Sequence, residues 1–175
     1  MSDEVTVTEA AYQGPAADLG LAFVAADFAL TGFHWRVAAQ PAELPGLAER
    51  FRRARYSLEM QTAEDRRPDL GVLRLVTTFA RFAVVGDRAG VDRHMVVVDL
   101  EPGATAPSLC GHYPAANWME REIFDMFGVH FTGHPDLKRI LLPDDSDFHA
   151  LLKDFGRMDG TGTEHGASAE AAHGD

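Results

Sequence analysis

Histidines and carboxylates gather between residues 112 and 134, and side chains of these types could bind a divalent metal ion. The residues concerned are His112, Glu120, Glu122, Asp125, His130 and His134. His130 and His134 have the i, i+4 spacing of two ligands on one helix. However, Gly133 and Pro135 flank His134, which favours a loop, and no acid stands beside His130 as in the His-Glu-x-x-His motif. A small metal-dependent hydrolase is therefore a remote alternative.

The single cysteine offers a second kind of chemistry, nucleophilic attack by a thiolate. Cys110 lies two residues before His112 in a loop, so the two side chains could meet. Its neighbour is an apolar leucine, a setting more typical of an unreactive packed thiol. One cysteine excludes an internal disulfide and a four-cysteine zinc or iron–sulfur site made by this chain alone. It also fits a reducing cytoplasmic compartment.

All three of these carboxylates fall on a predicted helix over residues 117–127, which Gly128 terminates. At about 100° per residue, one side of this signature helix is apolar: Ala116, Met119, Ile123, Met126 and Phe127. The other side mixes an aromatic residue with charges: Trp118, Arg121, Glu122 and Asp125. Protein interfaces combine aromatic residues with arginine, whereas a solvated face needs no tryptophan. The alternative is a surface helix with ordinary pairs such as Arg121–Asp125. Glu120, at the edge of the apolar side, needs a donor if it is buried.

The elements that position this helix are predicted from periodicity and turn residues. They are helices over 15–30 and 41–55, a short strand over 33–38, strands over 56–63, 70–80 and 94–100, and a loop over 101–107. Residues 81–86 either continue the strand over 70–80 or form a separate strand. Consecutive strands without intervening helices favour antiparallel pairing. We therefore expect an α+β fold: a mostly antiparallel sheet of about four strands with N-terminal helices on one face. The signature helix and an extended irregular C-terminal arm follow.

Composition sets the domain limits and the classes of partner. We expect a flexible N-terminus over 1–14, an α+β domain over 15–142, a docking arm over 143–158 and a disordered low-complexity tail over 159–175. The formal net charge of −11 gives no electrostatic reason to bind nucleic acid or an anionic membrane. No segment has the roughly 18 unbroken apolar residues of a membrane span. Any membrane attachment is therefore expected to go through partner proteins.

The stretch from Tyr113 to Asp145 resembles the signature of the C subunit of respiratory NADH:quinone oxidoreductase (complex I). The matching positions are Glu120-Arg121-Glu122, Asp125, Met126-Phe127, His134, Lys138 and Ile140-Leu141, all at the required spacing. The stretches Tyr113–Trp118 and Gly133–Leu137 are also similar to the family. A chance match over so many fixed positions is very improbable.

This resemblance implies a non-catalytic, cofactor-free subunit in the peripheral arm of a proton-translocating complex, at the cytoplasmic face of the cell membrane. Flavin, iron–sulfur clusters and quinone are then expected in partner subunits. The expected partners are the quinone-site large subunit and neighbouring iron–sulfur subunits. We predict that the partner interface consists of Trp118, Glu120, Arg121, Glu122, Asp125, His134, Lys138 and Arg139. The sequence agrees independently on cofactors, because its glycines form no dinucleotide-binding fingerprint.

The chain departs from the family in the segment Phe148–Phe155, which retains only part of the usual Gly-His-Pro-Leu-Arg-Lys-Asp-Phe motif. Related subunits also occur in membrane-bound [NiFe] hydrogenases. An equivalent subunit of a hydrogenase complex is therefore the alternative function.

Overall fold

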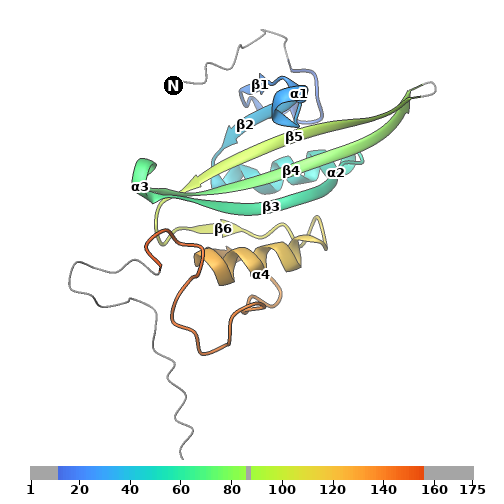
Figure 1. Cartoon of the computed structure of the whole chain (residues 1–175). Coiled ribbons are helices and arrows are strands. Elements are labelled where there is room, and N and C mark those ends of the chain that lie inside the picture. Colours follow the sequence, from blue (N-terminus) through green and yellow to red (C-terminus); the bar gives the residue numbers. More distant parts are fainter. Residues whose placement is uncertain (1–11, 86–87, 156–175) are drawn as a thin grey trace, which may run out of the picture.

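The computed structural model describes residues 12–85 and 88–155, and within them the fold is α+β. The main sheet has five strands in the order β1-β2-β5-β4-β3 (Figure 1). The strands are β1 (Phe23–Ala25), β2 (Trp35–Ala39), β3 (Ser57–Arg66), β4 (Val72–Val85) and β5 (Arg88–Leu100). All neighbours are antiparallel except β2 and β5, which are parallel. The predicted fold class is thus confirmed, with one strand more than expected.

The described helices are short apart from two. They are α1 (Phe28–Thr31), α2 (Leu44–Arg53), α3 (Arg67–Leu70) and α4 (Ala116–Phe127), with 3₁₀ turns η1 (Ala17–Leu19) and η2 (Pro41–Glu43). A second, two-stranded parallel sheet joins β6 (Thr105–Pro107) to β7 (His130–Thr132). These two short strands fall where the sequence predicted a loop and irregular chain, because three residues are too few to show a period.

One face of the main sheet is buried under α2 and α4. Strand β5 points alternate residues toward α2, including Val96 and Val98, which are fully or almost fully buried. From α2, Phe51 stacks on Phe79 of β4 with ring centroids 4.6 Å apart, and Tyr113 packs on the same Phe79 ring at 5.6 Å. Figure 1 shows α2 behind the sheet and α4 beyond the β3 edge. This packing fixes α4 against the sheet.

The predicted helix over 15–30 is wrong. Gly20 ends the 3₁₀ turn in a left-handed conformation at φ 68°, and the chain then enters β1, which pairs with β2. Asp27 caps the one-turn α1 by accepting the N–H of Ala29, and Gly32 ends it at φ 78°. The apolar, alanine-rich sequence suited a helix, but strand pairing and two glycines prevented one. Helix α2 and the signature helix α4 lie where predicted.

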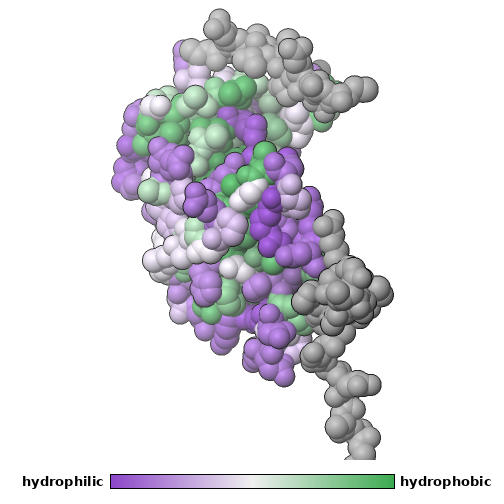
Figure 2. Space-filling model, turned by 90° about the vertical axis from the view of Figure 1, so that its left-hand side faces the viewer, coloured by the Kyte–Doolittle hydropathy of each residue, from purple (hydrophilic) through white to green (hydrophobic). Residues whose placement is uncertain are grey.

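Residues 133–155 contain no helix or strand and form the predicted irregular C-terminal arm beside α4. Figure 2 shows hydrophobic residues near the top of one face, where the N-terminal elements lie, and hydrophilic residues over much of the rest. The exposed apolar side chains of those elements include Val24, Phe28 and Leu30. Of the predicted terminal segments, residues 1–11 and 156–175 lie outside the described residues, whereas Tyr12 and the arm up to Phe155 are described.

Candidate functional site

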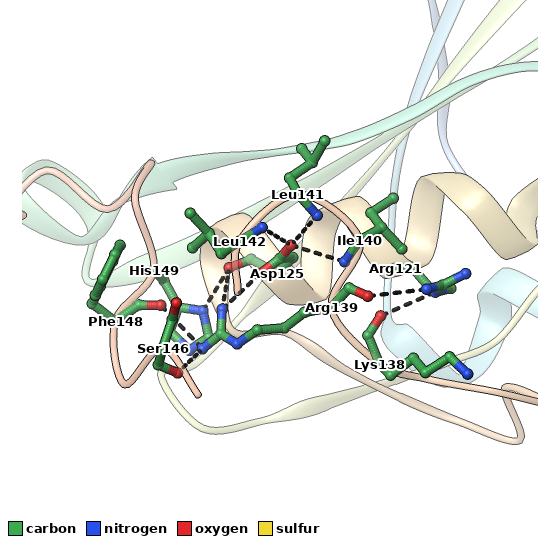
Figure 3. A network of polar contacts seen from close by, with 10 residues as sticks. All are labelled: Arg121, Asp125, Lys138, Arg139, Ile140, Leu141, Leu142, Ser146, Phe148 and His149. Carbon is green, nitrogen blue, oxygen red and sulfur yellow. Dashed lines mark hydrogen bonds and ion pairs between the residues drawn. The ribbon is translucent and has the colours of Figure 1, made fainter. Parts of the chain in front are cut away.

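The carboxylate of Asp125 is the centre of a hydrogen-bond network between α4 and the C-terminal arm (Figure 3). Asp125 is fully buried. Its Oδ2 accepts the backbone N–H groups of Ile140, Leu141 and Leu142 at 3.0, 2.7 and 2.9 Å. Burial alone would raise the pKa of this carboxyl, but these bonds and the Arg139 guanidinium outweigh it and lower the pKa to about 2. Asp125 is therefore charged at neutral pH although it has no contact with solvent.

Arg139 completes the network, which we call the arm clasp: Asp125, Arg139 and the backbone of residues 140–148. Its guanidinium donates to Asp125 Oδ1 at 2.6 Å and to the carbonyls of Ser146 and Phe148 at 2.7 and 3.1 Å. The Arg139 side chain is only 11% exposed. One arginine thus ties two turns of the arm to one helical carboxylate.

A second ion pair holds the end of the arm to the sheet. Asp65, at the end of β3, is 4% exposed and accepts the backbone N–H of Lys153 at 2.7 Å. Arg67 bridges Asp65 and Asp154, with distances of 2.8 and 2.7 Å. The Arg67 guanidinium holds the pKa of the Asp65 carboxyl well below its usual range. No sequence pattern signals this contact, because 87 positions separate Arg67 from Asp154.

Glu120 is the second fully buried carboxylate of α4, and its surroundings are different. It accepts the N–H of Leu109 and the hydroxyl of Ser108, both at 2.6 Å. Burial raises its pKa, in contrast to Asp125, because no cation and fewer N–H donors reach it. The donors that Glu120 was expected to need come from the loop before α4, and Glu120 fixes that loop.

Among the described residues, Cys110, Glu120 and His134 each place one ligand-type atom within 4.8 Å of the other two. His134 Nδ1 accepts the N–H of Asp136 at 3.0 Å, so Nε2 carries the proton and donates to the carbonyl of Asn117 at 3.1 Å. Both ring nitrogens are therefore engaged, and neither has a lone pair free for a metal. This arrangement fits a hydrogen-bonded loop better than a metal centre.

The thiol of Cys110 faces a carboxylate. Its Sγ lies 3.6 Å from Glu120 Oε2, and burial together with this acid raises its pKa. The nearby carboxylate of Glu120 disfavours the thiolate form of Cys110. Nucleophilic catalysis with His112 would need that thiolate, so this site does not support it.

The predicted interface residues divide into an outward and an inward group. Trp118 is 65% exposed, and the Arg121 guanidinium lies 5.4 Å from the centre of its ring. Arg121 also donates to the carbonyls of Lys138 and Arg139, both at 3.0 Å. The outward group is Trp118, Glu122 and Lys138, with Arg121 and His134 half-buried.

The inward group is Glu120, Asp125 and Arg139. The first two have no exposed surface, so in this structure they can act on a partner only through the segments they hold. The predicted Arg121–Asp125 ion pair does not form. Arg121 donates to backbone carbonyls of the arm instead, and Asp125 pairs with Arg139. Contact with a partner stays a prediction for the whole set.

Several known bacterial proteins are similar to parts of this chain. The NADH-quinone oxidoreductase C subunit from Roseiflexus sp. is 43% identical over 89 residues, covering 51% of this chain and 47% of that protein. The corresponding C subunit from Moorella thermoacetica is 65% identical over 49 residues, covering 28% of this chain and 33% of that protein. The chain thus matches half or less of the length of these relatives.

Two solved structures share the fold. A trypsin-resistant fragment (1–134) of Nqo5 has a TM-score of 0.53 and 23% identity, covering 70% of this chain and 93% of that one. A chain of an archaeal membrane-bound sulfane sulfur reductase has a TM-score of 0.51 and 22% identity, covering 63% and 64%.

The family match covers most of the described fold. None of the described helices is long and apolar enough to cross a membrane. The model of the respiratory-chain NADH dehydrogenase 30 Kd subunit family matches residues 37–161, well over half of the chain and including α4 with the arm clasp. These matches confirm the resemblance seen in the sequence, and the chain belongs to the family of the 30 Kd subunit of respiratory-chain NADH dehydrogenase.

Proposed function

We propose that this chain is a structural and assembly subunit of the peripheral arm of a proton-translocating NADH:quinone oxidoreductase, where it holds the quinone-site subunit. One observation carries the proposal: Trp118, a large aromatic side chain, is 65% exposed on a helix whose surroundings are locked in place. Interfaces use such aromatic anchors next to arginine, and a preorganised surface loses little entropy on binding.

The arm extends this surface. Leu141, Leu151 and Phe155 are 62%, 52% and 37% exposed, although the backbone of the same segment is tied down by buried carboxylates. A segment that is fixed from inside and apolar outside is suited to pack against another subunit. This supports a docking role for the arm, including residues 148–155, where the sequence departs from the family motif.

The proposal includes no cofactor in this chain. Glu120, Asp125 and His134 already form hydrogen bonds within the chain, which leaves these side chains engaged. Electrons would then pass through flavin, iron–sulfur clusters and quinone in partner subunits. The chain would attach to the cytoplasmic face of the membrane only through those partners. It would have no activity of its own.

Exchange of Trp118 for alanine tests this role. We expect a tagged Trp118→Ala chain to recover its partners from gently solubilised membranes about 30-fold less efficiently, since loss of an interface hot spot costs about 2 kcal/mol or more. Leu30→Ala is the matched control, because Leu30 is 85% exposed on α1, away from the proposed surface. Mass spectrometry of the recovered subunits is the measurement. Equal recovery with Trp118→Ala would remove this surface from the interface.

The same experiment separates the alternative. A hydrogenase-type assembly is the second candidate, because the family that the sequence resembles has related subunits in membrane-bound [NiFe] hydrogenases. The fold is also shared with a chain of an archaeal membrane-bound sulfane sulfur reductase. Recovery of flavin-bearing NADH-oxidising subunits supports the first proposal. Recovery of a [NiFe] hydrogenase large subunit without them would assign the chain to the second.

A further inference from the structure

A buried histidine lies far from the arm clasp, in a pocket of aromatic rings. His94, on β5, is 1% exposed, and neither ring nitrogen has a hydrogen-bond partner among the described residues. The walls are Tyr12, Phe23, Phe51 and Tyr56, whose ring centroids lie 5.0 to 6.3 Å from the imidazole. Such a pocket accepts a neutral imidazole, but it offers no hydration to an imidazolium.

The charged and titratable groups around His94 do not replace the hydration that an imidazolium would lose in this pocket. The nearest acid is Asp92, whose Oδ1 lies 3.6 Å from His94 Nδ1, too far for a good hydrogen bond. The same carboxylate accepts the Tyr56 hydroxyl and lies 3.6 Å from Arg81 and 3.9 Å from His34. Burial lowers the pKa of His94, with His34 and Arg81 adding to the effect and Asp92 opposing it. His94 is therefore neutral while the pocket is closed.

Tyr12 is the wall with the least support. It stacks on Phe23 at 3.7 Å and meets the edge of Trp35 at 5.1 Å, but its buried hydroxyl bonds to no side chain among the described residues. It precedes η1, whereas Phe23, Phe51 and Tyr56 belong to or adjoin paired strands and α2. Displacing Tyr12 is therefore the least costly way to admit water to His94.

The chain around Tyr12 is built for close contact and for a hinge. A Cβ at Gly14 would overlap the hydroxyl end of the Tyr12 ring, so the closed position requires glycine there. Two residues further on, Ala16 is fully buried, and Asp18 pairs with Arg50 at 2.7 Å. The chain is thus anchored from Ala16 onward, so within the described residues Tyr12 can move through changes at residues 12–15.

We propose that Tyr12 is an acid-sensitive latch: protonation of His94 displaces the Tyr12 ring from the aromatic pocket while the sheet stays intact. At pH values above about 6.5, the ordinary pKa of histidine, His94 is neutral whether the pocket is open or closed, so the latch stays closed. In the closed state the pKa of His94 is about 4. Between these two values the ratio of open to closed chains rises up to about tenfold for each unit by which the pH falls. Residues 12 and 14 lie outside the stretch that matches the family model, so the latch would belong to this chain and not to the family fold.

Fluorescence of Trp35 reports the latch. The sequence has two tryptophans, so the full chain with Trp118→Phe leaves Trp35, which touches Tyr12, as the single emitter. We expect its emission to shift to longer wavelength between pH 7.5 and pH 4.5 with unchanged far-ultraviolet circular dichroism. His94→Phe, which keeps a ring in the pocket, should abolish the shift, and the control His34→Gln should retain it. Gly14→Ala should show the shifted emission already at pH 7.5.

Three results would overturn the latch. One is a shift that persists in His94→Phe. Another is loss of circular dichroism together with the shift, which would show unfolding of the whole domain. The third is unshifted emission of Gly14→Ala at pH 7.5. If His94→Phe does not fold, His94→Gln, which also cannot gain a proton, replaces it with the same expected result.

Discussion

Replacing Asp125 with asparagine is expected to lower the free energy of unfolding by about 3–5 kcal/mol, the usual cost of removing one partner of a buried ion pair. The change keeps the shape of the side chain but leaves the Arg139 guanidinium, 11% exposed, without its countercharge. If the amide oxygen takes the place of Oδ2 and keeps the three backbone N–H bonds, the amide NH2 takes the place of Oδ1 and faces the Arg139 guanidinium, donor against donor. The arm should therefore detach from α4 even where the domain remains folded.

Urea unfolding followed by circular dichroism measures this change, and limited proteolysis within residues 140–155 reports the arm. Glu120→Gln is the matched control, because Glu120 is equally buried on the same helix. Burial raises the pKa of Glu120 and no cation pairs with it, so a neutral amide gives up less charge stabilisation here than at Asp125. We expect that control to change the free energy of unfolding by less than about 1 kcal/mol.

The two substitutions together test whether the charge of a buried carboxylate, and not its burial alone, stabilises this part of the chain. Equal losses in Asp125→Asn and Glu120→Gln would show that the difference in charge stabilisation between the two sites is unimportant. A stable Asp125→Asn variant with a protease-resistant arm would contradict the arm clasp itself.

Gly128→Ala is expected to destabilise the chain by about 2–4 kcal/mol, since a left-handed backbone strains alanine and a new overlap is added. Gly128 ends α4 at φ 77°, and a Cβ there would lie 2.7 Å from Nε2 of His149. His149 Nδ1 donates to the carbonyl of Asp125 at 2.9 Å, so the ring can move aside only by giving up that bond. The substitution should loosen the arm as well as the helix end.

Gly71→Ala separates the two contributions. Gly71 ends α3 at φ 73°, but no described atom lies within 4 Å of a Cβ placed there. This control should lose about 1 kcal/mol, the backbone part alone. Urea unfolding of both variants and arm proteolysis are again the measurements. If the two alanine variants lose the same amount, the His149 contact contributes nothing to the arm.

Elements with local signals could be predicted from the amino-acid sequence. The apolar stripe of α4, its end at Gly128 and the three- and four-residue spacing in α2 each depend on neighbours within one or two helical turns, so periodicity and a glycine sufficed. The charged positions of the signature were equally visible, and they led to the family. The α+β class followed from the run of strands from β3 to β5, which only the one-turn helix α3 interrupts.

The directions of the charged side chains and the path of the N-terminal stretch depend instead on long-range packing. Helical periodicity placed Asp125 on the outer side of α4, but the arm folds over that side and buries it. Pairing with β2 converted part of a helix-like stretch into β1. Arg67 and Asp154, like Tyr12 and His94, are brought together by chain closure over long separations, which no local pattern encodes. Burial and partners, which set the opposite pKa directions of Glu120 and Asp125, exist only once these segments have packed.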